Sequence, residues 1–460
     1  MKAEPRSALA TAAAVLDGAL SPEDLVREAL GRIDAENGVL RAVVTTDPED
    51  SLRQADHLAH RLAAGERPPL AGVPIVVKDA IWVAGWRVTQ GSRLYADFVA
   101  PADNVAVTRL RHAGAIVVGM ANMSEFGCKG VTSNPLHGTT RHPLDPRLTP
   151  GGSSGGCASA LGADLVPLGL GTDGGGSARR PAAHVGIVGF KPSGGLVADG
   201  PGFEGGGSRT SVLAPMGRSV ADVGAMFDVL LGADRVDPLS VALPTKKDGG
   251  RLRIAYAPTF GLGGPVDASV ETSVATALET LRAAGFDIIR FDPVWPTGAG
   301  EAALMPLQWA GLAKLHGARW QSEPTLFDPY IAAQIAKGLA QSDADVGAAR
   351  AMAVEILEAT QIFFAAFDLV IGPTTPCTAW PHDLLGPTEI DGQPVHDRAH
   401  AAFTPFFNHA LAAAISIPCG VDRRGLPIGL QIVGPRFADR RVLTMAAAAE
   451  RLLTATQPGG

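Results

Sequence analysis

Residues 150–181 read PGGSSGGCASALGADLVPLGLGTDGGGSARRP, and this stretch decides the fold of the chain. Serine-bearing glycine clusters stand at both of its ends, at 151–156 and 174–177. The apolar run 163–170 between them is typical of a buried strand. Glycine lets backbone N–H groups come close to a ligand and adopts φ values that other residues avoid. The stretch therefore predicts a strand between two loops in which backbone donors and serine hydroxyls face reacting atoms.

Outward from this stretch, helical and strand patterns alternate along the chain, as they do in an α/β fold. Residues 8–64 are predicted to be helical, with helix starts at Ser21-Pro22 and Asp47-Pro48 and a helix end at Gly38. Further helices are predicted at 103–112, 219–231, 266–284, most of 301–366 and 439–453, and strands at 73–77, 115–118, 253–256, 286–291, 368–371, 413–417 and 428–433.

The connection between the last two predicted strands is informative about the sheet. A short Gly/Asp/Arg turn joins them, which implies an antiparallel pair and hence a mixed sheet. The chain has no internal repeat and no clear linker. The sequence therefore predicts one large α/β domain over residues 1–460, with a mixed β-sheet core flanked by helices on both faces. Residues 1–66 are expected to form an N-terminal helical segment packed on that core.

The composition argues against several classes of partner. Of the 460 residues, 46% are apolar and only 18% are charged, against about 25% in an average globular protein. A net charge of −7 without a basic block argues against nucleic acid and anionic membrane as partners. No apolar run is long enough to span a bilayer, and the four cysteines lack metal-ligand spacing. We therefore expect no nucleic acid, no membrane, no metal, and a cytoplasmic location where thiols stay reduced.

One interpretation of the glycines is a dinucleotide-binding loop, because residues 169–174 match G-x-G-x-x-G after an apolar run. A helix should then begin, yet Pro181 follows closely and is expected to break it. Residue 194, near the place where an acid should bind ribose, is a glycine. We therefore discount this interpretation and expect no cofactor.

A second interpretation is the nucleophile elbow of an α/β-hydrolase-type esterase. Residues 151–155 satisfy G-x-S-x-G, which makes Ser153 the nucleophile. Asp368 and either His400 or His409 follow in the required order. The preceding residues, however, hold three prolines between 142 and 150 and resemble a loop rather than the strand that an elbow needs. This interpretation stays an alternative.

Six motifs together resemble the amidase signature family of amide hydrolases. They are GVPIVVKD at 72–79, NMSEF at 122–126, TPGGSSGG at 149–156, GTDGGGSAR at 171–179, GFKP at 189–192 and GLPIGLQIVG at 425–434. One glycine motif alone is weakly specific, but this constellation in this order is strong and spans most of the chain. The resemblance implies the fold of that family and hydrolysis of an amide bond.

In that family the serine matching Ser177 is the nucleophile, and the serine matching Ser153 is held on a cis peptide bond and relays a proton. The lysine matching Lys78 is the base, so the resemblance implies a triad of these three residues. A serine hydroxyl is a poor nucleophile until a positioned base accepts its proton. Lysine can be that base only when burial lowers its pKa, and the end of the apolar strand 73–77 is a place for such burial.

The resemblance also assigns roles around Ser177. The oxyanion hole is expected to consist of backbone N–H groups, those of Gly174, Gly175, Gly176 and Ser177. Arg179 matches a common family arginine and is expected to pair with Asp173 and brace the nucleophile loop. Arg180 falls where the family varies, and in some members with carboxylated substrates an arginine there is implicated in binding the acid. A surface or structural ion pair is the alternative role for Arg180.

We therefore predict hydrolysis of the carbon–nitrogen bond of a small linear amide through an acyl-enzyme on Ser177, releasing a carboxylate and ammonia or an amine. The expected partner is the amide itself, and a homodimer is a candidate assembly. An alternative within the family is the glutamine amidase subunit of a tRNA-dependent amidotransferase. Against it, SEFGC at 124–128 replaces the usual DEFAM pattern, and Arg180 stands where glutamine is customary. A catalytically dead binding homologue is a further alternative, against which the intact triad argues.

Overall fold

A mixed sheet of eleven strands runs through the computed structural model, which describes residues 6–205, 210–243 and 252–455. In sheet order the strands are β1 (Val43–Thr45), β3 (Ile116–Ala121), β2 (Pro74–Lys78), β6 (Leu168–Asp173), β8 (Val212–Gly217), β7 (Val188–Lys191), β14 (Ala413–Val421), β15 (Pro427–Gly434), β11 (Leu369–Pro373), β9 (Ile254–Tyr256) and β10 (Ile288–Arg290). β2 pairs in parallel with both β3 and β6, whereas β14 and β15 form an antiparallel pair. The predicted mixed sheet and its antiparallel pair are confirmed.

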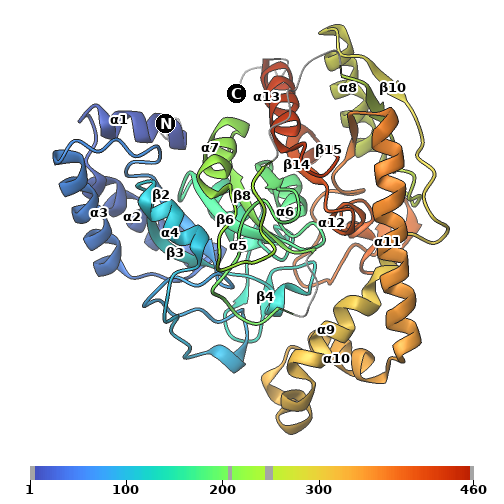
Figure 1. Ribbon diagram of the computed structural model, residues 1–460, viewed down its shortest axis with the longest axis horizontal. Coiled ribbons are helices and arrows are strands. Elements are labelled where there is room, and N and C mark those ends of the chain that lie inside the picture. The colour runs from blue at the N-terminus through green and yellow to red at the C-terminus, as the bar shows by residue number, and fades with distance from the viewer. Residues whose placement is uncertain (1–5, 206–209, 244–251, 456–460) are drawn as a thin grey trace.

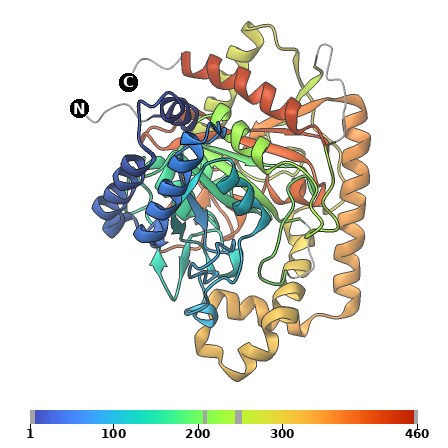
Figure 2. The same cartoon turned by 60° about the vertical axis from the view of Figure 1, so that its left-hand side comes forward.

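Helices cover both faces of this sheet, as predicted (Figures 1 and 2). They are α1 (Ala8–Leu16), α2 (Pro22–Leu40), α3 (Pro48–Ala63), α4 (Val105–His112), α5 (Gly155–Gly162), α6 (Arg179–Val185), α7 (Val220–Leu230), α8 (Ala268–Ala283), α12 (Pro405–His409) and α13 (Asp439–Ala455). Alternate residues of β2 show the two-sided burial: Ile75 and Val77 belong to one apolar core with α7 and α13, and Val76 belongs to another with α2 and α5. Strands buried on both faces read as continuous apolar runs, which is why β2 was recognisable.

The region 301–366 is helical, as predicted. It consists of α9 (Glu301–Ser322), α10 (Pro329–Ala340) and α11 (Asp343–Ala366). α9 and α10 lie side by side and project from the sheet at the bottom of Figure 1, while α11 returns along its right-hand edge. Two small hairpins complete the described chain, β4 (Ser133–Asn134) with β5 (Gly138–Thr139) and β12 (Glu389–Ile390) with β13 (Gln393–Pro394).

The first 66 residues differ from the purely helical prediction, because they also supply the edge strand β1. It pairs antiparallel with β3. Helix α2 continues past Gly38, so the predicted helix end is wrong; the helix ends before Arg41, which adopts φ 49°. The amide side chain of Asn37 explains the sharp turn into β1, since it accepts N–H from Ala42 and Val43 and donates to the Val43 carbonyl. The helix starts at Ser21 and Asp47 are confirmed, because each side chain accepts the N–H three residues later.

The predicted strand over 163–170 is only partly correct. Helix α5 occupies the preceding residues to Gly162, a turn with Asp164 at φ 58° follows, and β6 begins at Leu168 and continues to Asp173. Short apolar runs do not distinguish a buried helix end from a strand by periodicity. The strand therefore extends into the second glycine cluster, where its carboxyl end supports the loop before Ser177.

Pro181 does not exclude a helix, contrary to the expectation. It is the third residue of α6, in the first turn, where a missing N–H leaves no intrahelical bond unmade. Within the described residues, the structure contains no helix that combines the length and apolarity needed to cross a membrane.

Candidate active site

Strand β2 and strand β6 bring the three predicted triad residues to one edge of the sheet. Parallel neighbours end at the same edge, so Lys78, the last residue of β2, lies beside the loop that follows β6 and carries Ser177. Ser153 lies two residues before α5, which packs against both strands. The Gly152–Ser153 peptide bond is cis, as the family resemblance implied.

The amine of Lys78 is fully buried and surrounded by three hydroxyl groups. Its Nζ lies 2.7 Å from Oγ of Ser153, 2.9 Å from Oγ of Ser154 and 2.7 Å from Oγ1 of Thr172. Burial lowers the pKa of Lys78 to about 8, because the charged form loses its hydration. Both the desolvation expected from the sequence and the contact with Ser153 are therefore present.

The hydrogen bonds around Lys78 suit a neutral amine, which has two N–H donors and one lone pair. The Ser154 hydroxyl donates to the Thr172 carbonyl at 3.1 Å, so its oxygen is available to accept an N–H from Lys78. A second N–H can reach the Thr172 hydroxyl oxygen. The lone pair is then left for the hydroxyl proton of Ser153. For Ser154 the sequence left open a hydrogen bond near the site or a role in a turn, and it gave no indication of Thr172.

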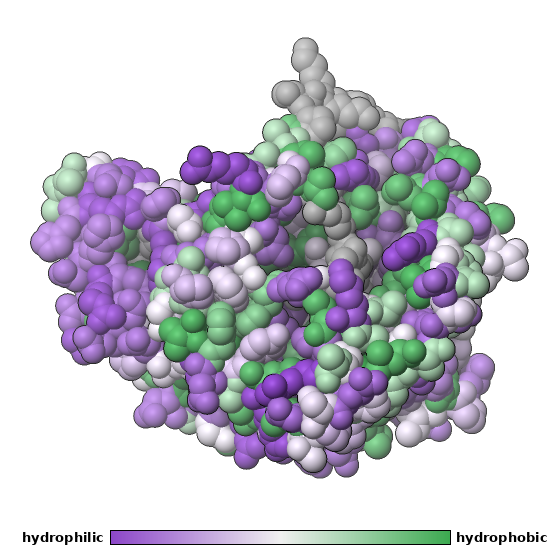
Figure 3. Space-filling view, turned by 60° about the horizontal axis from the view of Figure 1, so that its bottom comes forward, coloured by the Kyte–Doolittle hydropathy of each residue, from purple (hydrophilic) through white to green (hydrophobic). Residues whose placement is uncertain are grey.

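Ser177 lies at the wall of a cavity of about 400 Å³ that Ser153 also lines. The serine is 7% exposed, and its carbonyl accepts the N–H of Ser154 at 3.0 Å, which ties the two glycine clusters together. Figure 3 shows the side of the molecule that lies at the bottom of Figure 1; it is hollowed near its centre and bordered by both apolar and hydrophilic residues.

The amides of the second glycine cluster do not all point the same way. Gly176 donates its N–H to Oδ1 of Asp173 at 2.8 Å, so this amide is engaged with a carboxylate, which corrects its expected place among the oxyanion donors. Gly176 adopts φ 102°, and an added Cβ would lie 2.1 Å from Oγ1 of Thr404. In the described part of the chain, the amides of the neighbouring residues donate to no acceptor; these are Gly174, Gly175 and Ser177.

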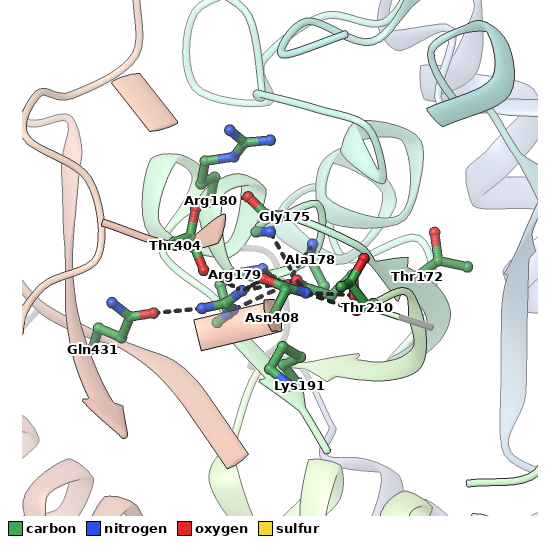
Figure 4. Close-up of polar contacts among 12 residues, drawn as sticks. Thr172, Gly175, Ala178, Arg179, Arg180, Lys191, Thr210, Thr404, Asn408 and Gln431 are labelled. Carbon is green, nitrogen blue, oxygen red and sulfur yellow. Dashed lines mark hydrogen bonds and ion pairs between the residues drawn. The ribbon is translucent and has the colours of Figure 1, made fainter. Parts of the chain in front are cut away.

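A buried ion pair holds this loop, as expected. Arg179 donates to both oxygens of Asp173, from Nη2 at 2.9 Å and from Nε at 3.0 Å, and neither side chain is exposed (Figure 4). Burial alone would raise the pKa of Asp173, but the charge and hydrogen bonds of Arg179 outweigh it and hold the pKa well below its usual range. Arg179 also donates to Gln431, and Asn408 donates to Asp173. Nothing in the sequence linked these two amides to the loop.

Arg180 points away from this network (Figure 4). It lines the cavity and is only 5% exposed, yet its Nε and Nη1 meet no hydrogen-bond acceptor among the described residues. Its Nη2 makes one long contact, 3.4 Å, with the Gly152 carbonyl. Burial lowers the pKa of Arg180 to about 10, still far above neutrality, so the group is a cation. A buried guanidinium with unused donors at a cavity wall is equipped to bind an anion.

The residues of the esterase interpretation are arranged differently from its expectation. The Ser153 hydroxyl contacts Lys78 rather than a histidine, and Asp368 is bonded to Arg253 and Arg441. The ring of His400 packs against the ring of Trp380, with the ring centroids 4.7 Å apart. The described chain has no strand leading into Ser153. The order of these residues along the chain therefore no longer supports the esterase alternative.

The dinucleotide interpretation also lacks its structural context, since α6 begins only at Arg179 and not at the end of the 169–174 motif. No group of three or more His, Cys, Asp or Glu side chains that could hold a metal ion occurs in the ranges that the structure describes.

Comparison with known proteins places the chain. A family model described as Amidase matches residues 24–443. An acylamidase of Rhodococcus erythropolis is 33% identical over 452 residues, covering 96% of this chain and 94% of that protein. A glutamyl-tRNA(Gln) amidotransferase subunit of Symbiobacterium thermophilum is 34% identical over 469 residues, covering 95% and 94%. A bacterial aryl acylamidase of the amidase signature family has a similar structure, with a TM-score of 0.90, 26% identity and 100% of both chains covered. This chain belongs to the amidase family, the amide hydrolases whose signature its sequence resembles.

Proposed function

We propose that this protein hydrolyses the carbon–nitrogen bond of a small linear amide through an acyl-enzyme on Ser177. The observation that carries the proposal is the environment of Lys78: a fully buried amine with a lowered pKa, 2.7 Å from the Ser153 hydroxyl oxygen. A lysine that is partly neutral near pH 8 is a competent general base, and burial is the physical means of making it one.

In the first half of the reaction, Lys78 accepts the hydroxyl proton of Ser153 while Ser153 accepts that of Ser177. The Ser177 oxygen then attacks the amide carbon, and the carbonyl oxygen becomes an oxyanion. Three amides of the loop are available to donate to it, those of Gly174, Gly175 and Ser177. Gly176 contributes indirectly, because its bond to Asp173 fixes the loop that presents the other amides.

In the second half, the proton held by Lys78 returns through Ser153 to the amide nitrogen, and the carbon–nitrogen bond breaks to release ammonia or an amine. Water then attacks the ester carbon of the acyl-enzyme, and its proton follows the same relay. Breakage of the ester bond returns a proton to Ser177 and releases the carboxylate. Each step transfers one proton and changes no oxidation state, so no redox partner is needed.

Arg180 is the proposed substrate-binding residue. A buried cation whose Nε and Nη1 lack acceptors within the described chain is costly unless a ligand completes its hydrogen bonds. A carboxylate on the substrate would accept two of those N–H groups at once. The three free thiols buried in the core and the half-buried thiol of Cys128 support the further proposal of a reducing, cytoplasmic setting.

The test of the mechanism separates the two serines. Ser177→Ala should abolish ammonia release and labelling by a fluorophosphonate, whereas Ser153→Ala should keep a slower label on Ser177. Label found on Ser153 in the Ser177→Ala variant would overturn the assignment of the nucleophile. The substrate is sought by measuring ammonia release from aliphatic, aromatic, carboxylated and carbamoyl amides.

The second candidate function is the glutamine amidase subunit of a tRNA-dependent amidotransferase. The 34% identity to such a subunit over 95% of the chain favours it. Against it stand SEFGC at 124–128 and Arg180. Adding the tRNA-binding partner subunits and glutamyl-tRNA to the ammonia-release assay decides between the two: strong stimulation of glutamine hydrolysis supports the amidotransferase, and unchanged hydrolysis of other amides supports the stand-alone enzyme.

A further inference from the structure

One wall of the cavity is a single face of helix α9. Six of the α9 residues that border the cavity recur at intervals of three and four along the helix: Leu304, Met305, Gln308, Gly311, Leu312 and Leu315. Residues at this spacing lie on one side of a helix. From Leu304 to Leu315 the rise of 1.5 Å per residue makes this face about 16 Å long. Five of the six residues are apolar or glycine, so the wall is an elongated apolar strip, which we call the α9 strip.

Apolar side chains outside α9 also line the cavity. Ile81, Met123 and Leu213 line the same cavity and are between 2% and 3% exposed. At one end of the cavity the ring of Phe126 stacks on the ring of His316, with the centroids 4.0 Å apart. The cavity, which we call the slot, therefore combines these apolar side chains with polar ones, among them Gln90, Asn104 and Ser211.

Six charged residues line the slot. Lys129, Glu301 and Arg398 form ion pairs, whereas Arg180, Asp199 and Glu204 form none with the described residues. Glu301, at the start of α9, forms an ion pair with Arg398, and Lys129 lies 2.6 Å from Asp328. Burial lowers the pKa of His316 to about 4, so that ring is neutral near pH 7. Burial lowers the pKa of Arg180 to about 10, so the group stays a cation at the cavity wall. None of the six residues of the α9 strip carries a charge.

Packing on the other face of α9 fixes the orientation of the helix, so that the α9 strip faces the cavity. It packs so tightly on α10 that a Cβ added to Gly338 would lie 2.0 Å from the Trp309 carbonyl oxygen. Gln334 of α10 donates to the Cys128 carbonyl at 3.0 Å, and the Asp328 N–H donates to Glu125 at 2.7 Å. The α9–α10 pair is thus tied to the loop beside Ser153, and the α9 strip has a fixed position relative to the triad.

We infer that the amide substrate carries an apolar substituent, aliphatic or aryl, that lies along the α9 strip, with Gly311 leaving the space for it. The inference rests on the proposed function and names the substrate class of that site. A cavity of about 400 Å³ falls in the range of small-molecule sites, which is more than a one- or two-carbon amide fills. Each added methylene that leaves water for this slot should raise kcat/KM about fourfold, the factor that corresponds to about 0.8 kcal/mol.

The first experiment measures kcat/KM over two series. One lengthens the acyl group from acetamide through butanamide to hexanamide and phenylacetamide; the other lengthens the amine side from N-methylacetamide to N-butylacetamide and acetanilide. A graded rise in either series supports the inference and identifies which side of the scissile bond occupies the slot. Flat or falling rates in both series would overturn it.

A pair of glycine variants then tests the position of the slot. Gly311 is at the centre of the α9 strip, so Gly311→Leu should lower the ratio of hexanamide to acetamide kcat/KM, or its equivalent in the amine series, at least tenfold. Gly347 lies inside α11, where an added Cβ meets nothing within 4 Å, and Gly347→Leu is the matched control for the change in helix propensity. An unchanged ratio in Gly311→Leu, or an equal fall in both variants, contradicts the inference.

Binding without turnover separates this inference from the proposed function. Calorimetry of the same amides with Ser177→Ala, with and without Gly311→Leu, should show affinity rising with apolar length only while residue 311 is glycine. If the wild-type protein hydrolyses none of the amides but binding still depends on length and on residue 311, the proposed reaction fails and the apolar slot stands. Binding that depends neither on apolar length nor on residue 311 overturns the inference, whether or not the protein hydrolyses the amides.

Discussion

Nζ of Lys78 and Oγ of Ser153 lie 2.7 Å apart and both side chains are buried, although 75 residues separate them along the chain. The contact exists because Lys78 ends β2 and Ser153 lies two residues before α5, which packs against β2. Burial lowers the pKa of the amine, and among the described residues the Ser153 hydroxyl is one of three groups that hydrogen-bond with it. The same packing therefore supplies both the lowered pKa and the contact with Ser153 that the proposed mechanism requires.

The pH dependence of the reaction should report Lys78. In the proposed mechanism the neutral amine is the base, and its pKa is about 8, so kcat/KM should fall tenfold for each pH unit below that value and reach a plateau above it. Lys78→Met should lower the rate about 100- to 10,000-fold and should abolish the pH dependence. Lys314→Met, on the exposed side of α9, is the matched control and should keep the profile. A midpoint near 8 that survives in Lys78→Met would assign the titration to another group.

The hydroxyl groups of Ser154 and Thr172 should tune that midpoint. Both oxygens accept N–H from the amine, and a protonated amine with three N–H groups gains more from them than a neutral one with two. Ser154→Ala or Thr172→Val should therefore lower the pKa of Lys78 and shift the midpoint by about one unit toward acid. Ser159→Ala is the control, since Ser159 lies in α5, just after Ser154, and its hydroxyl donates to the Arg141 carbonyl rather than contacting Lys78. A shift toward base would show that these hydroxyls act as donors.

The part of the site that the sequence predicted correctly is encoded locally. Lys78 ends an apolar strand, Ser177 follows another, and Arg179 stands six residues after the Asp173 with which it pairs, so short patterns were sufficient. Such patterns could not predict the direction of the Gly176 N–H, because that direction depends on the loop conformation that brings the Asp173 carboxylate close to it. Sequence motifs name the residues of a loop but not where each N–H points.

The partners of the site that come from far along the chain were not predictable in the same way. Asn408 lies on α12, and Gln431 lies on β15, against which α6 packs; they reach Asp173 and Arg179 only through this tertiary packing. The α9 strip has the apolar periodicity of any helix that packs on a core, so its pattern did not reveal that one face borders a cavity. Only the fold distinguishes a cavity wall from a packed face.

The Asp173–Arg179 pair should contribute strongly to stability. Removing one partner of a fully buried ion pair leaves an uncompensated charge, so Arg179→Ala should lower the free energy of unfolding by about 3–5 kcal/mol. Arg27→Ala breaks an exposed pair with Glu23 and should cost less than about 1 kcal/mol. Urea unfolding of both variants makes the comparison. A similar small cost for both would mean that water reaches Asp173 and replaces the missing guanidinium.

Arg180, unlike Arg179, should lower the stability of the fold and contribute to substrate binding. Its Nε and Nη1 meet no acceptor in the described chain, so an apolar residue of similar length should relieve a cost: Arg180→Met should raise the free energy of unfolding by about 1–3 kcal/mol. The same change should lower kcat/KM at least tenfold for carboxylated amides and little for neutral ones, because only the former lose a partner. Arg180→Lys keeps the charge without the planar fork and should lie between the two. If Arg180 were instead one half of a structural ion pair, Arg180→Met would unfold more easily and all amides would suffer alike. Unfolding in urea and the ratio of the two rates, measured on the same three proteins, therefore distinguish a residue kept for its substrate from one kept for the fold.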